Sequence, residues 1–420
     1  DDPDWNVYFN CLKAMYSKHH TNIDIAGSVD SIYKITPEEL YKCYNTFYNP
    51  ANMKLFIVGD LDPDKLIETI KEANNDDIDF SENIERFMEK EGRIEIFESY
   101  EPKKAVLKMS LPIVFGMMIQ ILYSMVDIYF IGKLNDPNQM AAANISMPIF
   151  MVTMALASIV GVGASSELAR ALGKKDEEKT RSILGTGFVL SFIIGLIYSI
   201  LVYGLKDKIA ILLGANNQLT ADYTRDYISI LGMGSLAVIF NYVLGQMLRS
   251  ESDVKTSVIG MTIGIIANII LDPIFILSFN MQVKGAAIAT ILGNLLSFIY
   301  YMYKYLAKKT FVRLDKDYVK LDKEISIAIL KIGIPASLNQ LLISLAMTIS
   351  NNIAKGYGVA TLAAMGIVSK IMSIGTFIYI GFAAGSQPIV GYNFGAENMP
   401  RLREILKTTY RIVIAIGLLL

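Results

Sequence analysis

The feature that most constrains this chain is a series of apolar stretches, each about twenty residues long, that begins at Leu111. About twenty residues are what an α-helix needs to cross the roughly 30 Å hydrocarbon core of a bilayer. Eight complete stretches are present, and a ninth starts near Leu406. The complete ones cover residues 111–132, 142–163, 183–205, 227–248, 257–277, 285–305, 325–346 and 360–381. The pattern predicts a mainly α, polytopic membrane helix bundle, and a soluble protein with buried helices is the weaker reading.

Charge divides the chain into two unlike parts. Residues 1–104 carry 22 Asp and Glu against 12 Lys and Arg, whereas residues 105–420 carry 18 against 27. The formal net charge of -1 therefore hides an acidic soluble segment joined to a basic, apolar one. No part of this pattern supports nucleic-acid binding, and the expected surroundings of the second part are the lipid bilayer.

Basic residues gather in alternate connections between the apolar stretches. The sixth connection alone holds Lys308, Lys309, Arg313, Lys316, Lys320 and Lys323. Short loops rich in Lys and Arg stay in the cytoplasm, so the second, fourth, sixth and eighth connections are predicted to face it. The N-terminal segment is then also predicted to be cytoplasmic, and the protein to be a multi-pass protein of the cytoplasmic membrane.

An internal repeat relates two parts of the apolar region. With an offset of 223, residues 107–112 (LKMSLP) fall on residues 330–335 (LKIGIP), and with an offset of 222 Gly173 falls on Gly395. Six spans per unit predict two lobes in the same orientation, related by an axis along the membrane normal. We expect a first lobe at 105–324 and a second lobe at 325–420 that is truncated, because a second full unit would run beyond residue 420.

The first 104 residues read as an α/β soluble fragment. Thr36-Pro37-Glu38-Glu39 is typical of a helix start, and residues 53–58 predict a buried strand. This segment resembles the insulinase-type (pitrilysin) zinc metallopeptidase family in Tyr16, His19-His20, residues 22–27, 35–38 and 47–50, Asn52-Met53 and Val58-Gly59-Asp60.

That resemblance implies a family in which an inverted H-x-x-E-H helix and a further glutamate hold the zinc. The chain has only two histidines, His19 and His20, and adjacent helical side chains point about 100° apart. We therefore predict no zinc site and no peptidase catalysis in the segment.

The apolar region resembles the multidrug and toxic compound extrusion (MATE) family over residues 107–420. The matching motifs are Leu111-Pro112, Gln120-x-Leu122-Tyr123, Val126-Asp127-x-x-Phe130-Ile131-Gly132, Gly161-Val162-Gly163, residues 268–275 (NIILDPIF) and residues 285–290 (GAAIAT). The resemblance implies two six-helix lobes and a secondary transporter rather than an enzyme.

Only two acidic residues lie deep in the first six apolar stretches, Asp127 and Asp272. An unpaired aspartate at the bilayer centre costs about 2.5–3.5 kcal/mol on insertion scales, so such residues persist mainly where they face a cavity or bind a cation. Gln120 and Asp127 share one helix face, as do Asn268 and Asp272. Their carboxylate and amide oxygens suit a proton or a hard cation such as Na⁺.

The MATE resemblance assigns charge coupling to Asp127, Asn268, Asp272 and Thr290. The structural alternative is that Asp272 caps a kink at Pro273 and that Asp127 sits among the lipid headgroups. A second branch of the family has its coupling glutamate in the seventh span, but no Asp or Glu occurs between Glu324 and Glu397 here. Five further residues are candidates for lining a substrate cleft, with snorkelling to an interface as the alternative for the last: Gln120, Tyr123, Asn339, Gln340 and Lys370.

These features predict a multidrug or xenobiotic exporter that exchanges organic cations or drug-like compounds for H⁺ or Na⁺. We expect no cofactor beyond the coupling ion. One alternative is a lipid-linked oligosaccharide flippase, against which the scarcity of basic residues inside the spans argues. The others are a soluble zinc peptidase and a non-functional fusion of a transporter with an inactive metallopeptidase fragment.

Overall fold

A computed structural model describes residues 94–134, 136–213, 218–307, 309–356 and 359–419. All of them belong to the second of two compact units, Met88–Leu420. The predicted helices and strand of the N-terminal segment, with His19 and His20, lie outside the described residues.

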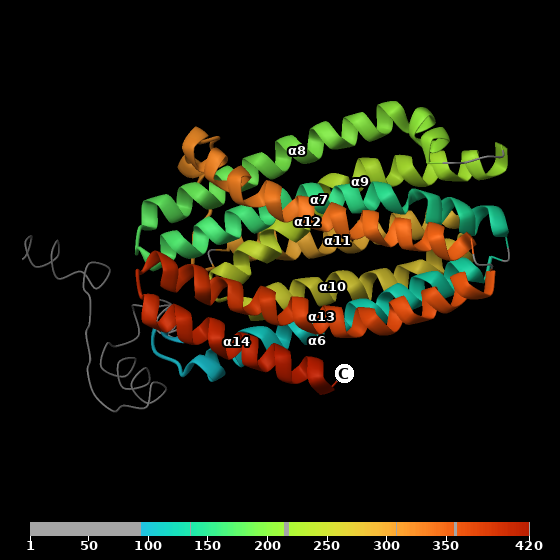
Figure 1. Ribbon diagram of the computed structural model, residues 1–420. Helices are drawn as coiled ribbons and strands as arrows, with labels where there is room; N and C mark the ends of the chain where they lie inside the picture. Colours follow the sequence, from blue (N-terminus) through green and yellow to red (C-terminus); the bar gives the residue numbers. More distant parts are fainter. Residues whose placement is uncertain (1–93, 135, 214–217, 308, 357–358, 420) are drawn as a thin grey trace, which may run out of the picture. The chain divides into compact units, whose positions relative to one another are not determined.

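Nine long α-helices make up most of the described chain (Figure 1), and no strand occurs in it. The helices are α6 (Pro102–Gly132), α7 (Pro137–Gly173), α8 (Glu177–Leu212), α9 (Gln218–Ser250), α10 (Val254–Pro273), α11 (Val283–Leu306), α12 (Lys323–Gly356), α13 (Val359–Gly395) and α14 (Met399–Leu419). Two short elements join them, the π-helical turn η3 (Ile274–Ser278) and the 3₁₀ turn η4 (Lys316–Tyr318). The predicted mainly α helix bundle is confirmed.

The predicted apolar stretches each lie within one helix, except for 257–277, which runs from α10 into η3, and most helices extend well past the stretch. The α13 helix continues to Gly395, for example, where the apolar pattern ends at Gly381. Four prolines lie inside α6, α7, α12 and α13 without ending them, as membrane helices tolerate. Within the described residues, seven helices are long and apolar enough to cross a membrane.

The α10 helix ends in an irregular way that matters for the site. Pro273 has no N–H to donate, and the chain widens after it into the π-helical turn η3, in which the Phe279 N–H donates to the Ile274 oxygen at 2.8 Å. Single π-helical turns of this kind frequently occur at functional sites. Asp272 therefore stands at the last regular turn of α10, directly before the distortion.

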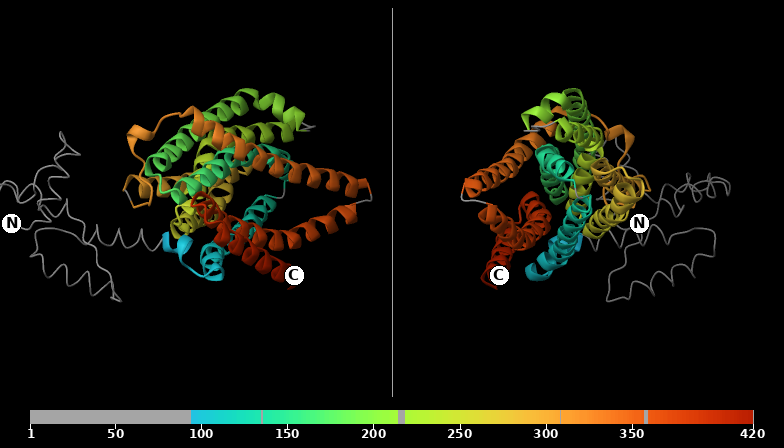
Figure 2. Two further views of the ribbon diagram at one scale, coloured as in Figure 1. Left: turned by 60° about the vertical axis from the view of Figure 1, so that its left-hand side comes forward. Right: turned by 90° about the vertical axis from the view of Figure 1, so that its right-hand side faces the viewer.

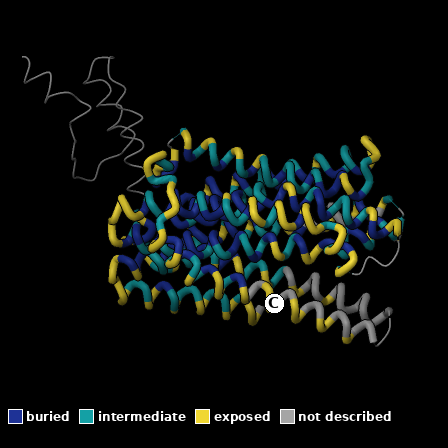
Figure 3. Tube along the Cα trace, turned by 90° about the horizontal axis from the view of Figure 1, so that it is seen from above, coloured by how far each residue is buried: buried dark blue, intermediate teal, exposed yellow. Residues whose placement is uncertain are grey.

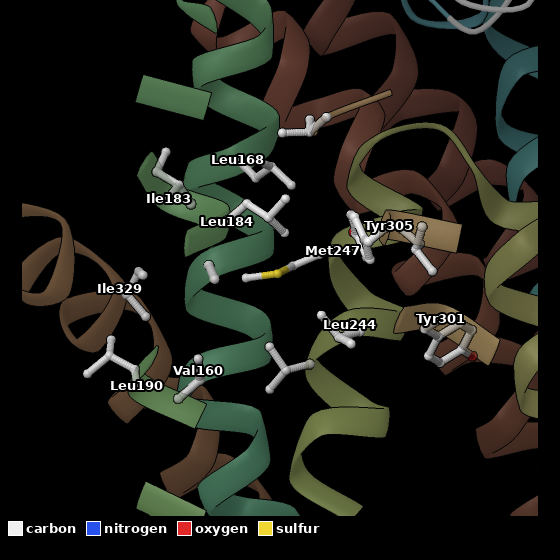
Figure 4. Packing of buried hydrophobic residues seen from close by; sticks show 14 of the residues in the cluster. Val160, Leu168, Ile183, Leu184, Leu190, Leu244, Met247, Tyr301, Tyr305 and Ile329 are labelled. Carbon is white, nitrogen blue, oxygen red and sulfur yellow. The ribbon is translucent and has the colours of Figure 1, made fainter. Parts of the chain in front are cut away.

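We call α6–α11 the first lobe and α12–α14 the second lobe. Within the first lobe α9 packs on α7, α8 and α11, and α10 packs on α6 and α11. Between the lobes α12 packs on α7, and α13 packs on both α6 and α7. Buried residues fill the interior (Figure 3), and the largest apolar cluster combines side chains of α7, α8, α9 and α11 with Ile329 of α12 (Figure 4).

The bundle has two ends with different chemistry. We define the basic end by the start of α6 and the connections after α7, α9, α11 and α13; the other end is the opposite end. At the basic end the lobes touch through glycines: a Cβ on Gly163 would collide with the Ile329 carbonyl, and one on Gly333 with the Ile159 carbonyl. Such close approach is possible only without side chains.

The α7 and α13 helices cross at the basic end in a reciprocal way. Gly173 of α7 lies against the Tyr392 carbonyl of α13, and Gly395 of α13 lies against the Arg170 carbonyl of α7. The two contacts are related by the same offset of 222 residues that relates the sequence repeat.

Toward the opposite end α12 and α13 diverge from the first lobe. The end of α12 and the start of α13 stand apart from α6–α11 in both views of Figure 2. Apolar side chains on the far half of α12, such as Ile349 and Ile353, are more than half exposed, whereas Ile329 near its start is fully buried. The lobes are thus closed together at the basic end and apart at the opposite end.

The turns that follow α7 and α13 are also repeated. Lys175 and Glu397 each adopt a left-handed backbone conformation with φ of 57°. The next residues, Asp176 and Asn398, begin α8 and α14 by accepting a hydrogen bond from the backbone N–H three residues further on, at 3.0 and 3.3 Å. The two lobes therefore share local geometry at positions where their sequences differ.

Candidate functional site

The candidate coupling residues of α10 and α11 lie together inside the first lobe. Asn268 and Asp272 are one helical turn apart on α10, with exposed fractions of 3% and 0%. The Asn268 side-chain amide donates to the Thr290 hydroxyl of α11 at 3.3 Å. Asp272 lies 18 residues from Val254, which places it about 27 Å along α10 from the basic end. The group is therefore closer to the opposite end.

Close packing of α10 on α11 places these side chains next to each other. A Cβ on Gly293 would collide with the Gly264 carbonyl, so the two backbones touch one turn from Asn268. The Ser297 hydroxyl then donates across the same contact to the Gly260 oxygen at 2.8 Å. Because the backbones meet here, the short side chains of Asn268 and Thr290 can reach each other.

The side-chain oxygen of Asn268, Oδ1, is buried and has no hydrogen-bond partner among the described residues. Leaving a buried acceptor unsatisfied costs about 1–3 kcal/mol. An acceptor at that position, beside the fully buried Asp272 carboxyl, matches what a proton carrier or a small cation needs. The oxygen atoms of this group are therefore suitable ligands for H⁺ or Na⁺.

Two asparagines extend the group, and neither was singled out from the sequence. Asn294 donates its side-chain amide to the Thr290 backbone oxygen at 2.8 Å and accepts from the Asn241 amide of α9 at 2.8 Å. The polar group thus joins α9, α10 and α11. Asn294 follows Thr290 by one helical turn, which is the signal that sequence reasoning had available.

The end of α6 packs close to the same region. Ile131 and its neighbour Phe130 belong to a small apolar cluster with Ile276 of η3, Ala286 of α11 and Tyr227 of α9. Asp127 lies four residues before Ile131, and its side chain is outside the described residues. The backbone of α6 nevertheless brings position 127 to the same end of the first lobe as Asp272.

The candidate cleft residues are distributed over three helices. On α6 Gln120 is exposed and Tyr123 is half-buried. Asn339 and Gln340 belong to α12 and Lys370 to α13, but their side chains lie outside the described residues. Among the residues that the structure covers, no group of three or more His, Cys, Asp or Glu could hold a metal ion.

A two-lobe bundle of membrane-crossing helices, closed at one end and with a buried polar site in one lobe, defines a membrane transporter. The family model MatE matches residues 112–274 and 335–420, and the Peptidase M16 inactive domain matches residues 34–115. The chain belongs to the MATE family, which confirms the resemblance seen in the sequence, and the metallopeptidase-like match at the N-terminal part is confirmed as well.

Curated relatives of the chain are multidrug exporters. The chain is similar to the multidrug export protein MepA of Staphylococcus saprophyticus, with 30% identity over 78% of this chain and 72% of that protein. The similarity to MepA of Staphylococcus aureus strain NCTC 8325 is 30% over 79% and 72%. The matches support a multidrug efflux transporter, and the flippase alternative stays a prediction.

Solved structures with the same fold are also transporters. A MATE protein in a straight conformation superposes with a TM-score of 0.74 at 30% identity, covering 77% of this chain and 72% of that one. A MOP superfamily transporter from Pyrococcus furiosus gives 0.72 at 30% identity, covering 76% and 70%.

Proposed function

We propose that the protein exports organic cations or drug-like compounds across the cytoplasmic membrane in exchange for H⁺ or Na⁺, with its basic end and N-terminal segment in the cytoplasm. The orientation rests on the basic connections at that end. With this orientation, the lobes are closed toward the cytoplasm and apart on the outside. A relative of known structure bears the description of an outward-facing multidrug resistance MATE transporter, with a TM-score of 0.72.

The observation that carries the coupling proposal is the Asn268–Thr290 pair beside a fully buried carboxyl at the distorted end of α10. A buried charge is costly, so we assign binding of the proton or cation to the fully buried carboxyl of Asp272. Asn268 and Thr290 contribute neutral oxygens, and Asp127 of α6 is the second acidic residue that we assign to coupling. Binding and release at this site then bias the packing of α10 and α6.

Export by alternating access follows if the site binds the ion with different affinity in the two states of the transporter, one open to each side of the membrane. A ligand can shift a conformational equilibrium only by its difference in affinity for the two states. The break at Pro273 gives α10 a place to adjust without breaking a helical hydrogen bond. Loss of the ion would therefore change the packing between η3 and the end of α6, which contact each other.

The test uses everted membrane vesicles, whose cytoplasmic face is on the outside, with a fluorescent organic cation added to the medium. An imposed pH gradient in one arm and a sodium gradient in the other should show which ion drives uptake. We expect Asp272→Asn and Asp127→Asn each to abolish uphill transport while the protein remains inserted and folded, and Thr290→Ala to give a milder loss. Uptake by both aspartate variants at the parental rate would show that these residues are structural.

A further inference from the structure

The chain segment before α6 makes an unusual set of contacts. Residues 94–101, which we call the N-terminal strap, form a short helical turn and then lead directly into α6 of the first lobe. Ile96 and Phe97 of the strap are buried, with exposed fractions of 7% and 2%. Both belong to an apolar cluster that also contains Phe382 and Tyr392 of the second lobe. The cluster also contains Met109 of α6, so the strap is continuous with the first lobe and packs where that lobe meets the second.

Aromatic and polar contacts fix the strap on the end of α13. The Phe97 ring stacks on the Tyr392 ring with centroids 5.0 Å apart. The Tyr392 hydroxyl donates to the Glu98 carboxylate at 2.6 Å, and the Asn393 amide donates to the Phe97 backbone oxygen at 3.2 Å. These contacts lie at the crossing of α7 and α13, because Tyr392 is also the residue whose carbonyl touches Gly173.

Arg401 of α14 holds the strap from the other side. Its Nε donates to the Phe97 oxygen at 2.7 Å and its Nη2 donates to the Tyr100 oxygen at 2.6 Å. These carbonyls lie at the end of the helical turn, where oxygens lack partners within the helix and attract positive charge. The planar guanidinium of arginine presents two nitrogens to the two oxygens in a fixed geometry, whereas a lysine offers a single nitrogen on a flexible stem.

The segment before α12 makes the corresponding contacts in the opposite sense. It leads into the second lobe but lies on α8 of the first lobe, where Arg181 pairs with Asp315 at 3.2 Å and the Thr186 hydroxyl donates to the Lys320 oxygen at 3.1 Å. Each lobe is therefore held at the basic end by the segment that leads into the other. The segment before α12 is joined to α11 as well, so it connects the lobes in every state, whereas the strap contacts can come apart.

We propose that the N-terminal strap is a releasable clamp that holds the basic end closed and must detach from Tyr392, Asn393 and Arg401 each time that end opens. This inference rests on the proposed function, since alternating access requires the opening. The strap continues into α6 and moves with the first lobe. Separation of α6 and α7 from α13 at the basic end would therefore pull the strap off α13 and α14.

The first test measures how often the basic end opens, without any transport. Ser110→Cys places a thiol at a fully buried position of α6 that faces Gly385 of α13. The background replaces the only two cysteines, Cys11 and Cys43, by serine. Labelling by a maleimide from the side of the basic end then reports exposure of the contact between the lobes.

Removing the Arg401 fork should raise the labelling rate. Arg401→Gln deletes two charge-assisted hydrogen bonds, and we expect labelling to increase roughly ten-fold, with Arg401→Lys in between. The matched control is Arg403→Gln, an exposed arginine of the same helix with the same change of charge. Equal labelling rates in Arg401→Gln and Arg403→Gln would overturn the proposal.

The second test asks whether the strap must detach during transport. A reducible bifunctional thiol reagent joins Phe97→Cys to Tyr392→Cys, which fixes the strap to the second lobe. In a matched pair it joins Tyr100→Cys to Lys108→Cys, whose parent side chains are 3.2 Å apart on the first-lobe side. We expect the first cross-link to stop export until a reductant is added, and the second to leave export unchanged.

The two proposals fail in different ways. Continued export by the protein cross-linked between strap and α13 would show that the clamp does not need to release. If the cysteine-free parent does not export at all, the proposed function is wrong, and the labelling comparison of Arg401→Gln with Arg403→Gln still decides whether the strap keeps the basic end closed.

Discussion

The two ends of the helix bundle differ in the contacts that they make. At the basic end the backbones of the two lobes touch at glycines. Polar side chains of the second lobe also hold the N-terminal strap there by hydrogen bonds. Toward the opposite end the lobes diverge, and the first lobe buries an amide oxygen that has no hydrogen-bond partner in the described chain. The first arrangement favours a closed contact and the second favours binding. A change at one end should therefore affect stability and closure, and a change at the other should affect transport.

The largest effect is expected where a glycine lets two backbones touch, and a second glycine without such a contact shows the effect of helix propensity alone. Gly333→Ala would push a methyl group into the Ile159 carbonyl, and we expect a loss of about 3 kcal/mol in stability or in closure of the basic end. Thermal unfolding in detergent and labelling of Ser110→Cys would measure the two. Gly204→Ala is the control, because nothing lies within 4 Å of its added Cβ, and it should be neutral or stabilising by up to about 1 kcal/mol. Equal effects would contradict the close contact.

A second change tests the anchoring of the segment before α12. Glu251 is 1% exposed, and its carboxylate accepts from the Tyr305 hydroxyl at 2.8 Å and from the Val312 N–H at 3.0 Å. Glu251→Gln turns one acceptor into a donor, so we expect a loss of about 2 kcal/mol, read as a lower midpoint of thermal unfolding. Glu178→Gln, at an exposed position of α8, should leave the midpoint unchanged.

A substitution at the opposite end should lower the rate of export and leave the closure of the basic end unchanged. Asn294→Ala removes the bridge between Asn241 and Thr290, and we expect export to fall roughly five-fold, which corresponds to about 1 kcal/mol. Asn144→Ala is the control, since that exposed amide only donates to its own helix at 3.0 Å. Faster labelling of Ser110→Cys in the Asn294 variant would mean that the two ends are not separate.

The smallest effect concerns an ion pair of the basic end. Arg181 and Asp315 are each about one-third exposed, so water screens their attraction. We expect Arg181→Gln to cost no more than about 0.5 kcal/mol, and the difference to vanish at high salt. A larger, salt-independent loss in thermal unfolding would show that this pair, and not Glu251, anchors the segment.

Helix number and order follow from hydropathy, but helix ends do not. The apolar pattern reports only the part of a helix that meets lipid tails, so it stops at Gly163 in α7 and at Gly381 in α13. Both helices continue through polar residues, because the other lobe covers them at the basic end. Hydropathy carries no information about that cover.

The candidate site could be predicted in part for a similar reason. Spacing of four residues places Asn268 and Asp272 on one helix face, and both are buried. Their assigned role in coupling stays a prediction. Asn241 was missed because its partner Asn294 is 53 residues away, and only the packing of α9 on α11 brings them together. The strap contacts span about three hundred residues of sequence and have no local signal.

The reciprocal crossing of α7 and α13 is self-complementary. Each glycine, Gly173 or Gly395, meets a carbonyl of the other helix, and Gln387 donates to Ser165, the residue that the repeat offset places opposite it. This is the kind of contact that two identical subunits make about a two-fold axis. A single ancestral unit with a glycine at this position would therefore have been able to pair with a second copy of itself. Fusion of the two copies would then have freed each half to change its sequence while the contact stayed the same.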